Sequence, residues 1–299
     1  MGIRLDHLII GVFALATILL VPVTYAFSIA PENSSFTNNN NNISKASSLN
    51  TISKRLNNTI SNLMGIAEAS MNKSNSFGKL PQVNLTSDMK IKFHGIRSDQ
   101  DLEKRIEAKQ LLANNKALLY VGLLLPNGDR YFGEPYSPYQ INSSVTNFAY
   151  KDHFVGALKT KQPYLSNVFK AVTTGEPLAI LASPIYTDIK NHQSLIGVQV
   201  LGLNFSYFND MIKSIMPETS NIKRIVIVDN NGTGIADSSL DNKNQNTESC
   251  KNLQSFQNAK NGETGSLTEN VNGKNMSIAY IPIKFAQTDW IALLFSSND

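Results

Sequence analysis

The residues with the most chemically active side chains lie between Phe148 and Ser166, where the sequence reads FAYKDHFVGALKTKQPYLS. Lys151, Asp152 and His153 place a cation, an acid and an imidazole side by side, with aromatic rings before and after them. Small-ligand pockets are built from aromatic walls and a few converging polar groups. The stretch therefore predicts one wall of a ligand-binding pocket.

The same residues do not form a catalytic pattern. Asp152 and His153 are adjacent, so on a strand their side chains would point to opposite faces and would not align as a triad. A metal site of His153 with Asp188 or His192 matches no known ligand spacing. The chain also lacks a Gly-x-Ser-x-Gly elbow, a His-Glu-x-x-His motif and a glycine-rich phosphate loop. We expect no enzymatic activity, no metal and no cofactor.

Each candidate ligand contact has a structural alternative. Lys151 is either a solvated charge or a ligand contact, and His153 is either a structural histidine or a ligand contact. Five aromatic residues divide between the core and the cavity, with two or three of them reaching the cavity: Tyr131, Phe154, Tyr164, Phe169 and Tyr186. Together with Lys151 and His153 they form the predicted ligand-binding set.

The N-terminal residues determine the compartment. Residues 8–30 contain no charged side chain, and this length is sufficient to span a bilayer. Arg4 precedes the run and Glu32 follows it, which places the N-terminus in the cytoplasm by the positive-inside tendency. Residues 1–31 are either a single-pass membrane anchor or a signal peptide cleaved after Ala26. Both alternatives export the bulk of the chain, either to the extracytoplasmic face of the cell membrane or, after cleavage, as a secreted protein.

The overall composition excludes two further classes. The 299 residues carry a formal net charge of +4, spread along the chain rather than clustered, so nucleic acid is not an expected partner. Cys250 is the only cysteine, which rules out an intrachain disulfide and leaves the fold to its hydrophobic core. Export makes the Asn-x-Ser/Thr sequences candidate glycosylation sites and predicts a glycoprotein; they begin at Asn33, Asn42, Asn57, Asn72, Asn84, Asn142, Asn204, Asn231 and Asn275.

A long helix follows a polar spacer. Residues 32–43 are rich in Asn, Ser and Thr and predict a flexible spacer. Apolar residues then recur at intervals of three and four and form one stripe on a helix: Leu49, Ile52, Leu56, Ile60, Leu63, Ala67 and Met71. This stripe lies either along the domains of the same chain or against a second copy, so a homodimer through the long helix is a candidate assembly.

A strand, a tight turn and a return strand occur twice along the chain. Residues 117–125 (ALLYVGLLL) lead through Asn127-Gly128 to 130–132, a hairpin in which both central turn residues need positive φ. Residues 225–228 lead in the same way through Asn231-Gly232 to 235–236. Closing strands follow at 178–186 and 195–205 in the first case, and at 276–283 and 290–295 in the second. The repetition predicts two modules of one type, each a small antiparallel sheet flanked by helices.

Two shorter helices complete the pattern. Residues 207–216 predict a helix that connects the modules and ends before Pro217. Residues 101–115 predict a helix whose inward face carries Leu102, Ile106, Ala108, Leu111 and Leu112.

This order of elements resembles the double Cache domain, the extracytoplasmic sensor of many chemoreceptors and histidine kinases. The matching segments are 150–154 (YKDHF), 157–159, 183–186 (SPIY) and 196–198 (IGV) in the first half, and 262–266, 280–283 and Trp290 in the second. The resemblance covers residues 44–295. It implies an α+β fold with an N-terminal transmembrane helix, a long helix and two PAS-like modules, each with an antiparallel sheet flanked by helices. It places the long helix and the membrane-distal module at 44–216 and the membrane-proximal module at 217–299.

The resemblance also implies a ligand pocket in the membrane-distal module. The family's Arg-x-aromatic motif falls on Lys151 and His153, and Lys151 supplies a cation without the bidentate fork of arginine. The amino-acid-binding branch has an acidic residue where this chain has Gly202, and a tyrosine and an aspartate where it has Phe169 and Ala171. Amino-acid binding by the family's usual geometry is therefore not expected.

These observations leave two functions open. The first is a membrane-anchored sensor, in which a small-molecule ligand in the membrane-distal module biases the long helix between two positions. If the chain is complete, the signal would pass through the N-terminal span or to a separate signalling protein. The second is a non-catalytic cell-surface structural or interaction protein that uses the fold as a scaffold.

Overall fold

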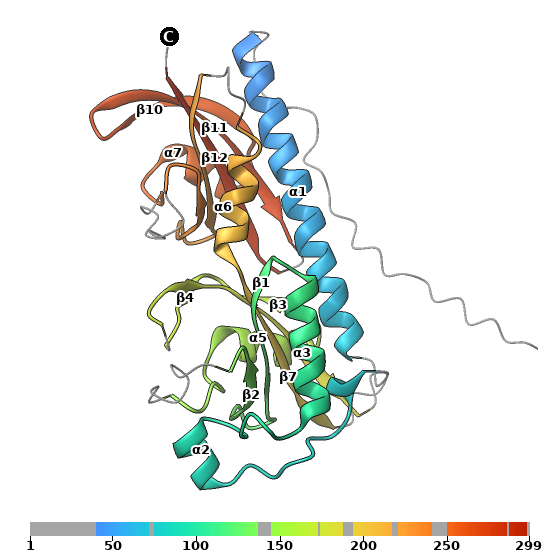
Figure 1. Cartoon of the computed structure of the whole chain (residues 1–299). Coiled ribbons are helices and arrows are strands. Elements are labelled where there is room, and N and C mark those ends of the chain that lie inside the picture. Colours follow the sequence, from blue (N-terminus) through green and yellow to red (C-terminus); the bar gives the residue numbers. More distant parts are fainter. Residues whose placement is uncertain are drawn as a thin grey trace, which may run out of the picture.

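The computed structural model describes residues 40–71, 75–136, 145–172, 174–187, 194–216, 221–240, 250–285 and 287–297. The predicted membrane segment and the part of the predicted spacer before residue 40 lie outside these ranges. None of the described helices has an apolar run that would carry it across a bilayer. Figure 1 shows a long helix running beside two sheets that follow one another along its length.

The first sheet has five antiparallel strands in the order β2-β1-β7-β6-β3. These strands are β1 (Leu118–Leu124), β2 (Arg130–Glu134), β3 (Tyr164–Leu165), β6 (Ile180–Tyr186) and β7 (Leu195–Leu203). We call the sheet and the elements around it, residues 75–203, the first module.

Helices and a small ribbon surround the first sheet. The short helices η1 (Ser76–Gly78) and α2 (Ser87–Phe93) lead to α3 (Leu102–Asn114), which packs on β1 and β2. Helix α5 (Asp152–Thr160) packs on β3 and β6. The strands β4 (Phe169–Lys170) and β5 (Pro177–Leu178) pair with each other in a separate two-stranded ribbon.

The second sheet repeats this design with the order β10-β11-β12-β8-β9. Its strands are β8 (Ile222–Asp229), β9 (Gly234–Asp237), β10 (Gly265–Val271), β11 (Lys274–Lys284) and β12 (Asp289–Ser297), all antiparallel. Helix α6 (Phe205–Lys213) connects the two sheets and contacts β9, while α7 (Gln254–Lys260) packs on β10, β11 and β12. Residues 221–297 form the second module. The predicted α+β fold with two modules of one type is confirmed.

Helix α1 (Asn40–Met71) is the element that both modules share. At 1.5 Å per residue its 32 residues extend over about 48 Å, which lets one helix pass along both sheets. Every residue of the predicted stripe is buried, and the helix contacts β6 and β7 of the first module and β11 and β12 of the second. Of the two alternatives, the stripe therefore lies along its own chain. The helix begins at Asn40, inside the segment expected to be spacer.

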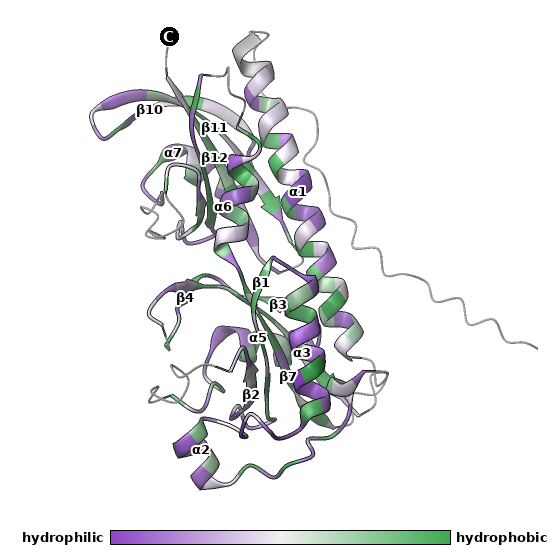
Figure 2. Ribbon diagram, viewed as in Figure 1, coloured by the Kyte–Doolittle hydropathy of each residue, from purple (hydrophilic) through white to green (hydrophobic). Residues whose placement is uncertain are grey.

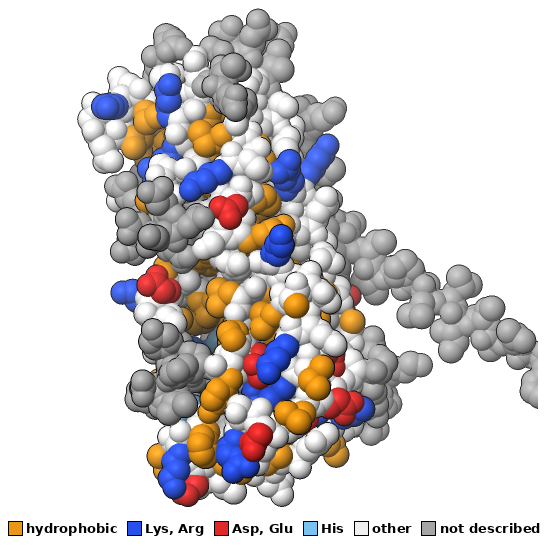
Figure 3. Space-filling view, in the orientation of Figure 1, with side chains coloured by type: hydrophobic (Ala, Val, Ile, Leu, Met, Phe, Trp, Pro, Cys, Tyr) orange, Lys and Arg blue, Asp and Glu red, His pale blue; other side chains and the backbone are white. Residues whose placement is uncertain are grey.

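The hydrophobic core follows the line where α1 meets the sheets. One continuous cluster joins Ile52 and Leu63 of α1 to Leu201 of the first module and Ile227 of the second. In Figure 2 the sheet strands are mainly hydrophobic, whereas the tip of the β10–β11 hairpin is hydrophilic. On the face that Figure 3 shows, basic and acidic side chains adjoin one another over the first module, whereas basic side chains predominate over the second.

Both predicted hairpins form, but their turns differ from the expected type. Gly128 (φ 85°) and Gly232 (φ 76°) have positive φ, while Asn127 and Asn231 before them do not. The register shifts within each hairpin, so each turn is joined to a bulge. The expectation that both central residues take positive φ was wrong for these two hairpins.

The turn with two positive φ values is the one between β10 and β11, which sequence reasoning did not single out. Asn272 (φ 51°) and Gly273 (φ 82°) form it, in a regular antiparallel register.

We expect Gly273→Ala to lower the free energy of unfolding by about 1 kcal/mol, because an L-residue is strained at this φ. Gly65→Ala in α1 should instead raise it by about 0.5–1 kcal/mol, because alanine is the better helix former. A Cβ at either position meets no atom within 4 Å, so packing does not contribute to the difference. Urea unfolding of the two variants measures it. A change of the same sign in both would contradict the assigned turn.

Helix α3 faces the first module differently from the prediction. Leu102 and Ile106 are each 54% exposed, whereas Lys104 and Arg105 are completely or almost completely buried. Only Ala108 of the predicted inward residues is fully buried. The inward face of the first half of α3 lies against carbonyl and carboxylate oxygens. The cationic side chains of Lys104 and Arg105 can donate hydrogen bonds to these oxygens, whereas leucine cannot.

Lys104 and Arg105 form a buried polar network between α3 and its neighbours in the first module. Arg105 donates from Nη1 to Glu134 Oε1 (2.5 Å) and from Nη2 to the carbonyl oxygens of Ile96 (3.0 Å) and Arg97 (2.9 Å). Lys104 donates to the carbonyl oxygen of Leu80 at 3.2 Å. Buried charges are tolerated when they are paired and hydrogen-bonded in this way.

Candidate functional site

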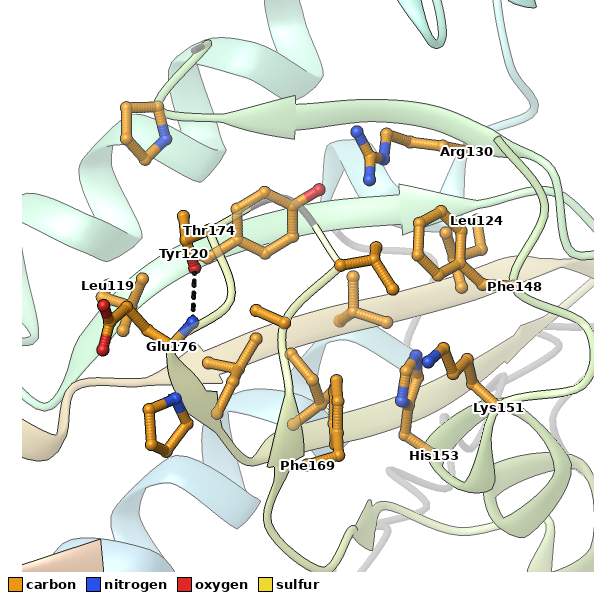
Figure 4. Close-up of a pocket in the computed structure, with 17 residues that line it drawn as sticks. Leu119, Tyr120, Leu124, Arg130, Phe148, Lys151, His153, Phe169, Thr174 and Glu176 are labelled. Carbon is orange, nitrogen blue, oxygen red and sulfur yellow. Dashed lines mark hydrogen bonds between the residues drawn. The ribbon is translucent and has the colours of Figure 1, made fainter. Parts of the chain in front are cut away.

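The first module contains a cavity of about 380 Å³. Strands β1, β6 and β7 contribute Tyr120, Ile180 and Val200 to it, and the start of α5 contributes His153. The β4–β5 ribbon and its loop form the remaining side, as Figure 4 shows. A cavity of this volume with mainly apolar walls suits a small organic molecule.

Glycines shape the cavity floor around Tyr120. A Cβ at Gly133 would come within 2.1 Å of the Tyr120 hydroxyl oxygen, and one at Gly122 within 2.8 Å. A Cβ at Gly202 would meet Tyr120 Cβ at 2.9 Å. The ring therefore lies against the two hairpin strands, and Gly202 adds no side chain to the floor. Burial raises the pKa of the Tyr120 phenol, which keeps it neutral.

Two cations line the cavity, and both lie over aromatic rings. Arg130 is 6% exposed, and its guanidinium carbon is 4.8 Å from the centroid of the Phe148 ring. The half-buried Lys151 places its ammonium 5.3 Å from the centroid of Phe169 and 5.1 Å from that of Tyr150. Among the described residues, neither cation forms an ion pair.

His153 contributes a neutral imidazole. Its ring stacks on Phe169 with centroids 5.6 Å apart, and the residue is 4% exposed. Desolvation, with a further contribution from the charge of Lys151, lowers the pKa of His153 to about 4. Nδ1 is buried and has no hydrogen-bond partner among the described residues. The ring can therefore donate one hydrogen bond and accept another at neutral pH.

Glu176 is the carboxylate of the described lining, and it lies on the exposed rim. Its backbone N–H donates to Thr174 Oγ1 at 3.3 Å, and its carbonyl oxygen accepts from the Ala171 N–H at 2.8 Å. Figure 4 places Glu176 at one end of the cavity and Arg130, Lys151 and His153 at the other.

Three members of the predicted ligand-binding set lie together in this cavity: Lys151, His153 and Phe169. The other four lie elsewhere. Phe154 is buried in the core behind the cavity, and Tyr186 is buried at the end of β6. Tyr164 donates its hydroxyl proton to Asp152 Oδ1 at 2.9 Å. One of the five aromatic residues thus lines the described cavity, where two or three were expected.

Strict alternation along β2 would place Tyr131 opposite Leu124 and facing the cavity, but Arg130 takes that position instead. The register shift pairs Leu123 with Phe132 and Leu124 with Arg130, so Tyr131 is the extra residue of a bulge. Tyr131 turns away from the cavity and donates to Asp101 Oδ2 at 2.8 Å, while Arg130 takes the place opposite Leu124, inside the cavity. Bulges commonly re-aim a side chain in this way.

Sequence reasoning missed Tyr120, Arg130 and Glu176 as lining residues. The alternation of Tyr120, Gly122 and Leu124 along β1 was the one available signal for the floor. Asp152 and His153 begin helix α5 rather than lying on a strand. Asp188 and His192, considered above for a metal site, lie outside the described residues, and no described cluster of His, Cys, Asp and Glu could hold a metal ion.

One wall of the cavity is attached to the second module. The N–H of Val168, next to Phe169, donates to Asp229 Oδ2 at 2.9 Å. The other oxygen of Asp229 accepts the N–H groups of Asn231 and Thr233, in the β8–β9 turn. Thr288 adds a hydrogen bond from its hydroxyl to the carbonyl oxygen of Leu165, at 2.6 Å. The cavity wall and the second module therefore share fixed contacts.

The first sheet is also attached to α1. Ser183 of β6 donates its hydroxyl proton to the carbonyl oxygen of Ala67 at 2.9 Å. Gln199 of β7 lies opposite Ser183 and is fully buried. The cavity-bearing sheet and the long helix are thus joined by a hydrogen bond as well as by the apolar stripe.

A Cache domain family model matches residues 35–297, so the chain belongs to the Cache domain family. The resemblance read from the sequence is confirmed. No curated protein sequence matches the chain.

Solved structures with the same fold include three chemoreceptor ligand-binding domains. That of the Pseudomonas aeruginosa amino acid chemoreceptor PctC with GABA has 13% identity and a TM-score of 0.59, covering 87% of this chain and 100% of that one. That of Campylobacter jejuni Tlp3 with L-valine has 17% identity and a TM-score of 0.55, covering 86% and 93%. That of Pseudomonas fluorescens CtaA with L-isoleucine has 14% identity and a TM-score of 0.54, covering 83% and 88%. At these identities the similarity shows the fold.

Proposed function

We propose that this chain is an extracytoplasmic sensor domain that binds a small molecule in the cavity of its first module. The observation that carries the proposal is a cavity of about 380 Å³ lined by two cations without ion-pair partners among the described residues. Membership of the Cache domain family supports it, as do chemoreceptor ligand-binding domains with the same fold. The first module would be the membrane-distal one, with residues 1–31 as the anchor.

Signalling would use two of the hydrogen bonds that join the cavity-bearing module to the rest of the chain. A ligand that draws the β4–β5 ribbon toward the sheet would act on α1 through Ser183 and on the second module through Val168. A ligand shifts such an equilibrium only by its difference in affinity for the two states. The stripe of α1 is used within the chain, so a homodimer would need another face of this helix. A separate signalling protein is the other candidate partner.

A thermal-shift screen of the full-length chain against carboxylates, amines, purines and sugars tests the proposal. At a ligand concentration of a hundred times Kd, we expect a stabilisation of about 2.7 kcal/mol, which rises further with the logarithm of the ligand concentration. Lys151→Ala should reduce this stabilisation, because Lys151 lines the cavity. Lys159→Ala is the matched control, since Lys159 is exposed in the last turn of the same helix.

Two outcomes would contradict the proposed binding. If no ligand class stabilises the chain, the scaffold function becomes the better explanation. If a ligand stabilises both lysine variants as strongly as the parent chain and the Lys151 variant keeps full affinity, the ligand does not occupy this cavity.

A further inference from the structure

The two cations that line the cavity, Arg130 and Lys151, lie at the same end of it, and this arrangement favours some ligand classes over others. Arg130 is buried, and its Nη1 has no hydrogen-bond acceptor among the described residues. A buried guanidinium without an acceptor is unfavourable, and planar carboxylates satisfy it best. Lys151 and the neutral His153 lie at the same end of the cavity in Figure 4 and add two further hydrogen-bond donors. This end of the cavity is therefore complementary to an anion.

Two carboxylates that the structure describes near this end do not neutralise it, because both are engaged elsewhere. Asp129 pairs with Lys90 and accepts from Asn147 at 2.9 Å. Asp152 accepts from Tyr164 at 2.9 Å. Neither of these aspartates lines the cavity.

The remaining carboxylates are also unsuited to this role. Glu134 pairs with Arg105 on the other side of the hairpin, with 2.5 Å between Oε1 and Nη1. Glu176 lines the cavity, but it is exposed and lies at the opposite end. Water screens an exposed charge strongly. Among the described residues no carboxylate balances Arg130, which leaves this position open to an anionic group of the ligand.

The same arrangement disfavours an ammonium group next to the ligand carboxylate. In an α-amino acid the ammonium is attached one carbon away from the carboxylate, so it would lie beside Arg130 and Lys151. Two of the three aromatic rings in the described lining are already covered, Phe148 by Arg130 and Phe169 by Lys151 and His153. The third, Tyr120, lies against the hairpin strands on the cavity floor. Like charges placed together without a counter-charge reduce affinity.

We infer that the cavity takes carboxylates with an apolar body and no ammonium group. The inference rests on the proposed ligand-binding function and names its ligand class. Arg130 would hold the carboxylate, with Lys151 and His153 beside it. Leu124, Leu178 and Val200 would enclose the apolar body.

Matched compounds test the inference on the full-length chain at neutral pH by titration calorimetry. Hydrocinnamate and L-phenylalanine differ by one ammonium group, and isocaproate and L-leucine differ in the same way. We expect at least one of the two carboxylates to bind about tenfold or more tightly than its amino acid, and about tenfold or more tightly than its own amide.

Variants locate the interaction at Arg130. Arg130→Met should weaken carboxylate binding about tenfold or more, while the weak binding of the amide stays the same. Arg130→Lys should recover part of the loss, because it restores the charge without the fork. Arg97→Met is the control for lost charge, since Arg97 is exposed in the same module and pairs with Asp99.

The outcomes separate this inference from the proposed function. If an amino acid, an amine or phenylphosphonate binds more tightly than the carboxylates, or if Arg130→Met leaves carboxylate affinity unchanged, the inference is wrong and ligand binding stands. If neither carboxylate binds while another class in the screen does, the inference is also wrong. If no class binds, the proposed function itself fails.

Discussion

Arg105→Met should lower the free energy of unfolding by about 3–5 kcal/mol, the largest loss we expect from one substitution. Arg105 is 1% exposed and donates to Glu134 and to three carbonyl oxygens. Methionine fills a similar volume but donates nothing, so Glu134 would remain buried as an unpaired carboxylate. Equilibrium unfolding in urea measures the loss.

A double-mutant cycle separates the ion pair from the packing. Adding Glu134→Gln to Arg105→Met should cost less than the sum of the two single changes, because the second change removes the charge that the first left unpaired. Arg97→Met, at an exposed pair with Asp99, should change stability by less than about 0.5 kcal/mol. Additive losses in the cycle would show that the pair contributes little.

The second large effect is a loss of stability at low pH through His153. The pKa of this histidine is about 4 in the folded chain, against its ordinary value of 6.5. The unfolded chain therefore takes up the proton first as the pH falls, and stability is lost from about pH 6.5 down to about pH 4. The difference of about 2.5 units corresponds to roughly 3 kcal/mol.

His153→Phe isolates this contribution. Phenylalanine can keep the stacking on Phe169 and does not titrate. The parent chain should lose roughly 3 kcal/mol more than the variant between neutral pH and about pH 4, by urea unfolding at each pH. The two proteins differ at this one titratable group, so the comparison isolates it. Equal losses would mean that His153 is solvated and titrates normally.

The architecture could be predicted because its signals are local and repeated. The apolar residues of the α1 stripe keep one helical period, and each of the two hairpins has an apolar strand followed by Asn-Gly. The inward face of α3 could not be predicted in this way. Periodicity assigns Leu102 and Ile106 to the core. The buried residue is instead Arg105, whose hydrogen-bond acceptors are Glu134 and carbonyl oxygens of residues 96–100, and only the tertiary fold brings these groups together.

The site was predictable where one short segment supplies it. Lys151 and His153 come from the dense stretch around the start of α5, and both line the cavity. Arg130 was not predictable, because a strand with strict alternation would have placed Tyr131 opposite Leu124. The bulge in this hairpin shifts the register, so that Arg130 rather than Tyr131 lies opposite Leu124. Pairing register depends on both strands, so the sequence of one strand does not reveal it.

The hydrogen bond between Val168 and Asp229 has a thermodynamic consequence. Coupling between two binding sites is reciprocal. If a ligand in the cavity changes the affinity of the β8–β9 turn for a second molecule through this contact, that molecule changes the affinity of the cavity by the same factor. A molecule that binds the second module and favours the position of Asp229 would raise the affinity of a cavity it never touches. Ligand affinity would then report on both modules together rather than on the first module alone.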